Sequence, residues 1–597
     1  MPTKSQSVPV IPISPGIAVG RVLLIRKRSH STLPELRFIP AENIPAEIDR
    51  FNDAIKRTKA QLIDLKKRLE EKLNTHDADI FDAHLMLVDD RSLTGEVEKR
   101  IKENLWTAEY ALYDTADHFS KIFANIADEY LQERAVDIRD VAERMMANLE
   151  EMAPAEDIDD RRIVIAPTLT PSETVTLDSS KVLGFAVESG SATCHTAILA
   201  RSMELPAVAG VPPEILSSLG SDDKVIIDGF SGRLIINPDA RTEESYRIRA
   251  KSADELSNEL RQDKELRPET TDGFEIELAI NLENADQIPE LAKTGAGAVG
   301  LFRTEYLFIN APQPPDEEKQ FEIYKQLLLD AEDAPVTVRT MDLGGDKLED
   351  SLYYHNEDNP FLGLRGIRFC LYGRRDLFET QLRALLRAGL YGDLRIMLPM
   401  VSSVMEVLEV KKIILTLQEQ MTEQGIEHVH HPKLGVMIET PVAALMAEHL
   451  AEHVDFFSLG TNDLVQYTMA IDRGNEKVAY LYRPSHPSIL QLIRMCTAAA
   501  KKHNIYVSVC GQMASDPEMI PLLAGLGVNE LSTVPGALPV IRRVIRSISM
   551  HEAEMTVRAA LNCATAKETL ALSMKLLQKY APEIVTPQPI IQENDAL

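Results

Sequence analysis

Near the middle of its C-terminal half, the chain reads LRIMLPMV (394–401), then KLGVMIET (433–440), then VDFFSLGTNDL (454–464). Five runs of the same texture flank these three: FEIELAINL (274–282), AVGLFRTEY (298–306), PVTVRTMDL (335–343), IYVSVCG (505–511) and NELSTV (529–534). A helix, or a loop and a helix, follows each run, which is typical of parallel strands joined by crossover helices. Eight such strands within ~310 residues predict a closed (β/α)8 barrel of the TIM type, with a doubly wound open sheet as the alternative.

Upstream of the barrel pattern, the texture of the chain changes twice. Residues 1–40 and 151–239 contain short strand patterns such as RVLLIR and KVIIDGF, whereas 41–150 repeats apolar residues at three- and four-residue steps. We therefore predict a multidomain α/β chain whose first β/α domain (1–40 and 151–239) is split by an inserted helical bundle (41–150). The predicted order continues with a charged, glycine-free helical linker, the barrel domain and a C-terminal tail, at 240–269, 270–580 and 581–597.

Composition excludes several classes of protein. Of 597 residues, 44% are hydrophobic and 26% charged, as in soluble globular enzymes. The chain has 64 Lys and Arg against 92 Asp and Glu, a net charge of −28, which argues against binding to nucleic acid or to anionic membranes. The N-terminus lacks the apolar region of a signal peptide, and no apolar run reaches the length of a membrane span. Five cysteines without a CxxC pair indicate reduced thiols, so we expect a cytoplasmic protein with no membrane insertion.

Polar side chains gather where the predicted barrel strands end, which is where TIM-barrel active sites lie. The strand ends carry arginines, carboxylates, an amide and a thiol: Arg303 with Thr304 and Glu305, Arg339 with Asp342, Glu439, Asn462 with Asp463, and Cys510, while Arg473 lies in the loop after the sixth strand. Guanidinium groups bind phosphate and carboxylate through paired hydrogen bonds, and a pair of carboxylates suits Mg²⁺. The implied ligand is a small molecule that bears both phosphate and carboxylate.

A second candidate site is the segment GSATCHTAILAR (190–201). Its glycine-led turn precedes an apolar helical run, which predicts that His195 lies near a helix N-terminus, where backbone N–H groups stabilise an anion. An imidazole in that setting can carry a phosphoryl group, although it could also be a histidine that only hydrogen-bonds within a turn. Cys194 is a rival nucleophile, but a phosphate-handling barrel favours His195.

One motif is a false lead. The letters GAGAVG (295–300) match GxGxxG, yet they follow a predicted helix and precede a predicted strand. A dinucleotide-binding loop requires the opposite order, so we predict a tight turn and no nucleotide site here.

Several motifs together resemble one family. They are GSATCHTAILARSMELPAVAG, VGLFRTEYLF, RTMDLGGDK, NPFLGLRGIR, GVMIETP, FFSLGTNDLVQYTMAIDRGN and VCGQMASD, and the likeness extends from PGIAVG near the N-terminus to the last barrel helix. The chain in this respect resembles the phosphoenolpyruvate (PEP)–protein phosphotransferases, Enzyme I of the bacterial phosphotransferase system. This resemblance implies a swivelling phosphohistidine domain, an inserted helical subdomain that docks the small carrier protein HPr, and a PEP-binding barrel that also forms a homodimer.

The resemblance also implies roles for individual residues. His195 would be the phosphorylated histidine, Thr170 would contact its phosphate, and Cys510 would be the proton donor. The residues that would hold PEP are Arg303, Arg339, Asn462, Asp463 and Arg473, and those that would bind Mg²⁺ are Glu439 and Asp463. The histidine loop departs from the family pattern Gly-Gly-Arg-Thr-Ser-His, because this chain has no arginine there.

The implied reaction transfers the phosphoryl group of PEP to His195 and then to HPr, and it releases pyruvate as the first step of sugar uptake. A nitrogen-related regulatory branch is the alternative, and the lack of an N-terminal GAF-type sensor favours sugar uptake. A nucleotide-dependent relative, such as pyruvate phosphate dikinase or PEP synthase, needs a large ATP-binding domain, for which the helical insert is too small. A third alternative is an inactive scaffold, against which the intact set of strand-end residues argues.

Overall fold

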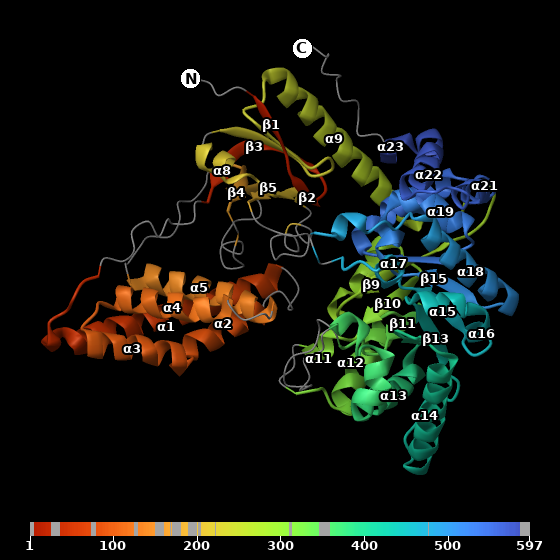
Figure 1. Cartoon of the computed structure of the whole chain (residues 1–597), viewed down its shortest axis with the longest axis horizontal. Coiled ribbons are helices and arrows are strands. Elements are labelled where there is room, and N and C mark those ends of the chain that lie inside the picture. Colours follow the sequence, from red (N-terminus) through yellow and green to blue (C-terminus); the bar gives the residue numbers. More distant parts are fainter. Residues whose placement is uncertain are drawn as a thin grey trace. The chain divides into compact units, whose positions relative to one another are not determined.

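The structure is a computed structural model of the chain, and it describes residues 5–25, 36–72, 79–124, 129–149, 160–167, 169, 181–188, 200, 205–220, 223–309, 313–344, 359–473, 475 and 477–585 (Figure 1). The chain divides into two compact units, Met1–Glu255 and Leu256–Leu597. None of the helices in the described ranges combines the length and the apolar character that a membrane span requires.

Eight parallel strands form the centre of the second unit. They are β9 (Glu277–Leu282), β10 (Ala298–Arg303), β11 (Val336–Arg339), β12 (Leu394–Leu398), β13 (Lys433–Ile438), β14 (Phe456–Leu459), β15 (Tyr506–Val509) and β16 (Glu530–Thr533). Each strand pairs with the next along the chain, and β16 pairs in parallel with β9, which closes the barrel. The predicted (β/α)8 barrel is therefore confirmed, and the open-sheet alternative is wrong. The strands are buried on both faces, as is usual in parallel sheets. Because the sheet closes on itself, no strand is left with an unpaired edge.

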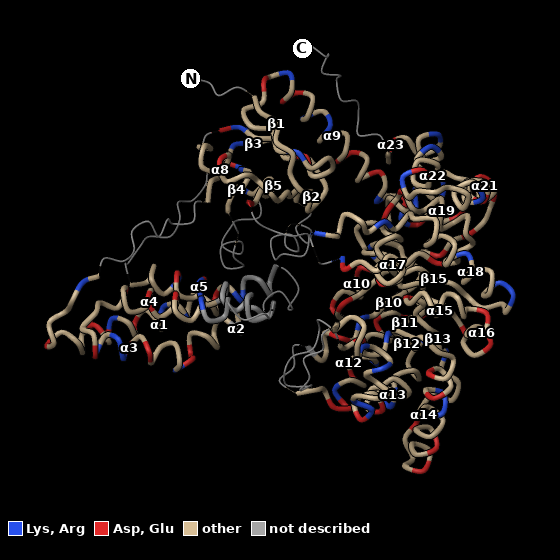
Figure 2. The backbone as a smooth tube through the Cα atoms, in the orientation of Figure 1, with Lys and Arg blue, Asp and Glu red and all other residues tan. Residues whose placement is uncertain are grey.

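Helices surround these strands. They are α10 (Pro289–Thr294), α11 (Tyr306–Ile309), α12 (Glu317–Asp330), α13 (Arg375–Ala388), α14 (Val404–Glu423), α15 (Pro441–Leu445), α16 (Ala447–Ala451), α17 (Thr461–Met469), α18 (Pro487–His503), α19 (Ile520–Gly525), α20 (Leu538–Ser547), α21 (Met550–Ala560), α22 (Ala566–Tyr580) and α23 (Pro582–Val585). Acidic and basic residues are interspersed along the helices (Figure 2), and many pair across them, as Arg383 on α13 does with Glu317 on α12 at 2.6 Å. The main core lies between the strands and the helices. A smaller cluster, which includes Leu301, Met437 and Cys510, is formed by side chains from the strands and from the residue that follows β15.

The predicted turn at GAGAVG is confirmed. Gly295 ends α10 in the left-handed region, with φ +64, and β10 begins three residues later. A side chain there would bring its Cβ within 2.3 Å of the carbonyl oxygen of Lys264. The first glycine therefore serves backbone geometry and close packing, as a helix C-terminus often requires.

The first unit contains an eight-stranded mixed sheet and a helical bundle. The strands are β1 (Gln6–Pro9), β2 (Ile11–Ser14), β3 (Ile17–Leu24), β4 (Arg162–Ala166), β5 (Val182–Val187), β6 (Ala207–Ala209), β7 (Lys224–Asp228) and β8 (Arg233–Ile236), in the order β1-β8-β7-β3-β4-β5-β6-β2. Strand β3 pairs in parallel with β4 and antiparallel with β7, so segments before and after the helices share one sheet. A short helix, α8 (Pro213–Ser218), precedes β7.

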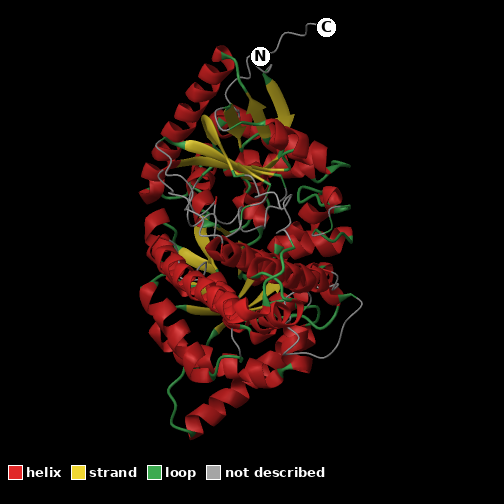
Figure 3. Cartoon of the chain, turned by 90° about the vertical axis from the view of Figure 1, so that its left-hand side faces the viewer, coloured by secondary structure: helices red, strands yellow, loops and turns green. Residues whose placement is uncertain are grey.

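Among the described residues, five α-helices lie between the two groups of strands in the sequence. They are α1 (Ile44–Lys72), α2 (Asp79–Asp89), α3 (Arg91–Asn104), α4 (Ala108–Ala124) and α5 (Glu129–Leu149), and the long ones run alongside one another (Figures 1 and 3). Their apolar faces enclose a core of their own, with Phe51, Leu62 and Leu112 fully buried. After the sheet, α9 (Ala240–Gln262) is held by an ion pair at 3.2 Å between Arg249 and the buried Asp228 of β7.

Candidate active site at the C-terminal end of the barrel

A polar cavity of about 150 Å³ lies at the C-terminal ends of the barrel strands. It is lined by Leu301, Arg303, Arg339, Asp342, Phe361, Arg365, Met437, Glu439, Gly460, Asn462, Asp463, Arg473, Cys510 and Gly511. Every barrel residue predicted as a PEP, Mg²⁺ or proton-transfer residue is in this set. One placement differs from the expectation, because β14 ends at Leu459 and Asn462 and Asp463 lie in the first turn of α17.

Two predicted arginines reach the cavity from neighbouring strands. Arg339, at the end of β11, is 6% exposed and donates from Nη2 to Glu305 Oε1 at 2.7 Å, while its Nη1 lies 3.4 Å from Asp342 Oδ2. Arg303, at the end of β10, is more exposed and donates to Glu283 Oε1 at 3.0 Å. Both cations are thus held by carboxylates at positions where an anionic ligand can approach.

Arg365 completes the set, although the strand-end rule did not single it out. Its guanidinium donates to both oxygens of Asp342, at 3.1 and 3.0 Å, and reaches Asp463 Oδ2 at 3.2 Å. Burial lowers the pKa of Arg365, but the charges of Asp342 and Asp463 outweigh burial, so the net shift is upward. Arg365 lies in the loop between β11 and α13, so the only sequence signal for it was the motif NPFLGLRGIR (359–368).

Glu439 is a buried carboxyl group in an acidic environment. It is 1% exposed, and burial, followed by the charges of Asp463 and Asp342, raises its pKa to about 8. One of its oxygens accepts a hydrogen bond from the backbone N–H of Met400 at 2.6 Å, and Met400 holds the left-handed φ of +56. A proton or a cation must therefore compensate this group near neutral pH.

The donor set fits Mg²⁺. Within the described residues, no three His, Cys, Asp or Glu side chains are arranged to hold a metal ion. Glu439 and Asp463 supply two carboxylates, both of which line the cavity. Mg²⁺ in phosphate-transfer sites commonly binds one or two carboxylates and takes its remaining oxygens from substrate and water.

Cys510 follows β15 and faces the same cavity. It is 5% exposed, and its sulfur accepts a hydrogen bond from the Ser458 hydroxyl at 3.3 Å. Burial raises the pKa of the Cys510 thiol to about 11. The group therefore keeps its proton at neutral pH, as a general acid must.

Comparisons with known proteins agree over most of the chain. Three family models match: "PEP-utilising enzyme, N-terminal" over residues 10–134, "PEP-utilising enzyme, mobile domain" over 158–232, and "PEP-utilising enzyme, PEP-binding domain" over 257–550. The phosphoenolpyruvate-protein phosphotransferase of Listeria monocytogenes is 40% identical over 581 residues, which cover 96% of this chain and 99% of the relative. The protein of that name from Staphylococcus aureus is 38% identical, over 95% of this chain and 99% of its own length. The chain belongs to the phosphoenolpyruvate–protein phosphotransferase family.

Membership in this family confirms the resemblance predicted from the motifs. Among solved structures, a solution structure of Enzyme I is 37% identical, with a TM-score of 0.37, and covers 41% of this chain and 99% of that one. The N-terminal domain of a nitrogen Enzyme I is 24% identical, with a TM-score of 0.30, and covers 40% of this chain.

The predicted residues of the phosphohistidine site are not placed by the structure. His195, Thr170 and the rival nucleophile Cys194 all lie outside the described residues. Their roles as phosphoryl carrier, phosphate contact and competing thiol stay predictions from the sequence and the family.

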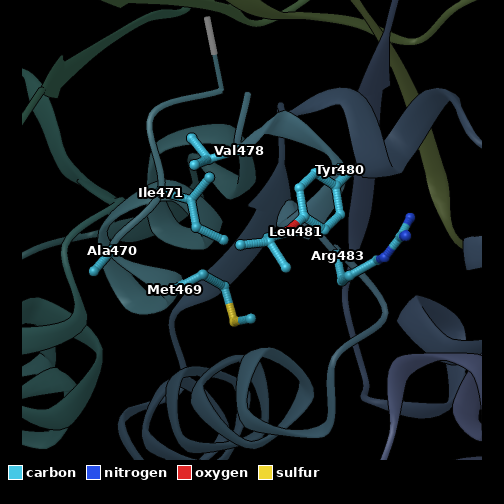
Figure 4. Close-up of a pocket in the computed structure, with 7 residues that line it drawn as sticks. All are labelled: Met469, Ala470, Ile471, Val478, Tyr480, Leu481 and Arg483. Atoms are coloured by element: carbon cyan, nitrogen blue, oxygen red, sulfur yellow. The ribbon is translucent and has the colours of Figure 1, made fainter. Parts of the chain in front are cut away.

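A second, larger pocket of about 530 Å³ is formed by the end of α17 and the segment after it (Figure 4). It is lined by Met469, Ala470, Ile471, Val478, Tyr480, Leu481 and Arg483, and none of these is a predicted site residue. Its lining is mostly apolar and offers a single cation, so it lacks the groups that phosphoryl transfer requires.

Proposed function

We propose that the chain transfers the phosphoryl group of PEP to His195 and then to a carrier protein of the HPr type, releasing pyruvate. This is the first step of phosphotransferase-system sugar uptake. The observation that carries the proposal is one cavity in which arginines, three acidic side chains and a protonated thiol converge.

The arginines would bind the two anionic ends of PEP. Arg303, Arg339 and Arg473 line the cavity and can donate paired hydrogen bonds to phosphate and carboxylate oxygens, and Asn462 adds an amide. A guanidinium keeps its charge in a buried site, which a lysine would not do as reliably. Because Arg303 and Arg339 are already held by Glu283 and Glu305, these two guanidinium groups need little reorganisation when the substrate enters.

Glu439 and Asp463 would hold Mg²⁺. Bound Mg²⁺ would supply a positive charge that offsets the negative charge on the transferring phosphoryl oxygens. Glu439 would enter that state deprotonated, although its pKa is raised to about 8 without a cation. We therefore expect Mg²⁺ affinity to rise with pH up to about 8, because the metal competes with a proton.

Cys510 would protonate the leaving group. When the P–O bond to the enol oxygen breaks, the electron pair stays on that oxygen, and the enolate of pyruvate remains. The S–H bond of Cys510 then breaks, a C–H bond forms at C3, and pyruvate and a thiolate result. The thiolate would regain its proton from solvent before the next turnover.

Labelling with radioactive PEP and Mg²⁺ tests the central step. We expect stoichiometric, acid-labile label on the wild-type chain and on Cys194→Ala, which is the matched control from the same loop. His195→Ala should take up no label, and addition of ATP should change nothing, which separates this function from that of a nucleotide-dependent dikinase. Label on His195→Ala, or label that maps to Cys194, would contradict the proposal.

The domain division and the partners form the second part of the proposal. We propose that 1–40 with 151–239 forms the swivelling phosphohistidine domain, that 41–150 docks HPr, that 240–269 links them to the barrel at 270–580, and that 581–597 is a tail. The sheet that joins β3 to β4 and β7 and the separate core of α1–α5 support the first two assignments. Mixing phosphorylated chain with HPr should transfer the label, and the nitrogen-branch carrier should accept it more slowly.

The assembly and the location follow the same reasoning. We propose a homodimer formed by the barrel unit, because large apolar side chains such as Val442, Leu445 and Tyr480 are exposed there. A Leu445→Glu variant should shift the mass in light scattering towards the monomer. We propose a cytoplasmic location, because a thiol acid needs a reducing compartment, and the four cysteines in the described ranges are all free.

A further inference from the structure

Glu305 lies directly behind the cavity without lining it. It follows β10 by two residues and is 2% exposed. Its Oε1 atom accepts two hydrogen bonds, from Arg339 Nη2 at 2.7 Å and from the backbone N–H of Asp342 at 3.0 Å. One carboxylate oxygen thus ties together a side chain and a backbone segment that both belong to the site.

A buried polar network supports the same segment from the other side. The Thr304 hydroxyl donates to the carbonyl oxygen of Arg339 at 2.9 Å, and Gln381 Nε2 donates to that hydroxyl at 3.1 Å. Gln381 Oε1 accepts the backbone N–H of Met341 at 2.9 Å. Residues 339–342 are therefore fixed by side chains from the segment that follows β10 and from α13, and Thr304, Glu305 and Gln381 are all buried.

The segment in turn leads to a metal-site carboxylate. Asp342 forms a two-bond pair with Arg365, and Arg365 reaches Asp463. The charges alternate in sign from Glu305 through Arg339, Asp342 and Arg365 to Asp463. A free arginine side chain loses rotamer entropy when it is fixed, so a support that fixes it in advance lowers the cost of binding.

We propose that Glu305 is a positioning residue: by accepting hydrogen bonds from Arg339 and from the backbone of Asp342, it fixes the guanidinium that holds the phosphoryl group. Glu305 does not line the cavity, so it would act through Arg339 rather than on the substrate. The inference rests on the proposed function for its kinetic consequence, because Arg339 acts on a phosphoryl group only if PEP is the substrate. On this proposal, the position of the accepting oxygen of Glu305 matters more for the reaction than the negative charge of its side chain.

Three substitutions of Glu305 distinguish the effect of the position of its oxygen from the effect of its charge. Glu305→Gln keeps an amide oxygen that can accept both bonds but removes the charge, whereas Glu305→Asp keeps the charge on a side chain that is one methylene shorter. We expect kcat for pyruvate release to stay within about fivefold of wild type in Glu305→Gln and to fall about 100-fold in Glu305→Asp and Glu305→Ala. The KM for PEP should change less than kcat, because the loss is one of orientation in the transition state.

Glu530→Ala is the matched control, because Glu530 is an equally buried glutamate at the start of β16, away from the cavity. Its kcat should equal that of wild type even if its melting temperature falls as much as that of Glu305→Ala. An activity order in which Asp exceeds Gln would overturn the positioning role and assign a charge role. Equal loss of kcat in Glu530→Ala would reduce Glu305 to a structural residue.

A binding measurement keeps this test separate from that of the function. Calorimetry with inorganic phosphate should give a dissociation constant about tenfold higher for Glu305→Asp than for Glu305→Gln or wild type. If wild type released no pyruvate from PEP, the proposed function would fail, while this phosphate comparison would still decide whether Glu305 positions Arg339. Equal phosphate binding by all variants would overturn the inference.

Discussion

The two ends of the barrel differ in how most of their acidic side chains are compensated. At the C-terminal end, Glu305, Asp342 and Asp463 are paired with Arg339 and Arg365. At the N-terminal end, Glu277 and Glu530 begin β9 and β16 and share the hydroxyl of Tyr506, at 2.9 and 2.5 Å. A single hydroxyl proton cannot form a full hydrogen bond to both carboxyl groups. Burial, partly offset by the Tyr506 bond, raises the pKa of Glu530 to about 7.

The difference separates function from stability. Arginines leave fixed charges in the barrel, which is costly, but those charges are available to an anionic substrate. A buried carboxyl group that keeps its proton, as the raised pKa of Glu530 favours, adds no charge to the barrel, which is cheaper, but it offers no cation to bind phosphate. Active sites of TIM barrels lie at the end where the first arrangement is found. The following predictions test this contrast, from the largest expected effect to the smallest.

The largest effect should come from removing an arginine at the C-terminal end. Arg339→Gln should lower kcat/KM for pyruvate release about 1,000-fold, because it removes a preorganised donor to the phosphoryl group. It also leaves the buried Glu305 without its cation, whereas Asp342 keeps Arg365, so the melting temperature should fall. The control is Arg395→Gln, since Arg395 lies over the ring of Tyr506 at the other end. A coupled pyruvate assay measures both, and comparable losses in the two variants would abolish the contrast.

The next effect concerns the proton donor. Cys510→Ala should lower the rate of pyruvate formation about 100-fold while the KM for PEP stays within threefold, because the thiol acts in the transition state. Since the pKa of Cys510 is about 11, the wild-type rate should show no loss from this group between pH 6 and 9. Stopped-flow measurement of pyruvate release checks both points. The prediction would be contradicted if the wild-type rate fell with a midpoint near pH 8 and the Cys510→Ala rate showed no such midpoint. The thiol would then be far more acidic than its pKa of about 11 implies.

A medium effect, on stability alone, is expected at the N-terminal end. Because the folded pKa of Glu530 is raised from 4.5 to about 7, the folded chain binds more protons than the unfolded chain between these values. The contribution of Glu530 to the free energy of unfolding should therefore be most favourable below pH 4.5. It should decrease as the pH rises to about 7. Glu530→Gln removes this loss, so the variant should be more stable than wild type at pH 8, by up to about 3 kcal/mol.

Denaturant titrations at pH 5 and pH 8 measure that change. The gain of Glu530→Gln should shrink towards pH 5, and pyruvate release should be unaffected at either value. A variant that is less stable at pH 8 than wild type would show that Glu530 is ionised and paired, as the carboxylates at the other end are.

The smallest effect should come from an exposed pair at the functional end. Glu283 and Arg303 form an ion pair at 3.0 Å, but their side chains are 45% and 36% exposed. Glu283→Gln should therefore change the free energy of unfolding by less than about 1 kcal/mol and the KM for PEP by less than threefold. Thermal melts and steady-state kinetics measure these values. A tenfold change in the KM for PEP would mean that the exposed Glu283 matters for Arg303 as much as the buried Glu305 matters for Arg339.

Local sequence patterns were sufficient for the barrel strands and for most of the site. Strands such as 394–398 are short, apolar and bounded by turns, and the residue that follows a parallel strand must lie at the C-terminal end. That is why Arg303, Arg339, Glu439 and Cys510 could be placed together from the sequence. Asn462 and Asp463 were assigned to a strand end, but they begin α17, because helix starts and strand ends differ by only a few residues in a tight βα turn.

The sequence by itself determined the order of strands and helices, the family, and which residues could serve chemistry, because these depend on neighbours within a few positions. Only the tertiary structure decided that Arg365 joins Asp342 to Asp463, and that Glu305 holds Arg339. It also decided that Glu277 and Glu530 share one hydroxyl, because closure of the barrel sets β9 beside β16. The charge state of a carboxyl group depends on burial and on the nearest charges, and here those come from segments far apart in the chain.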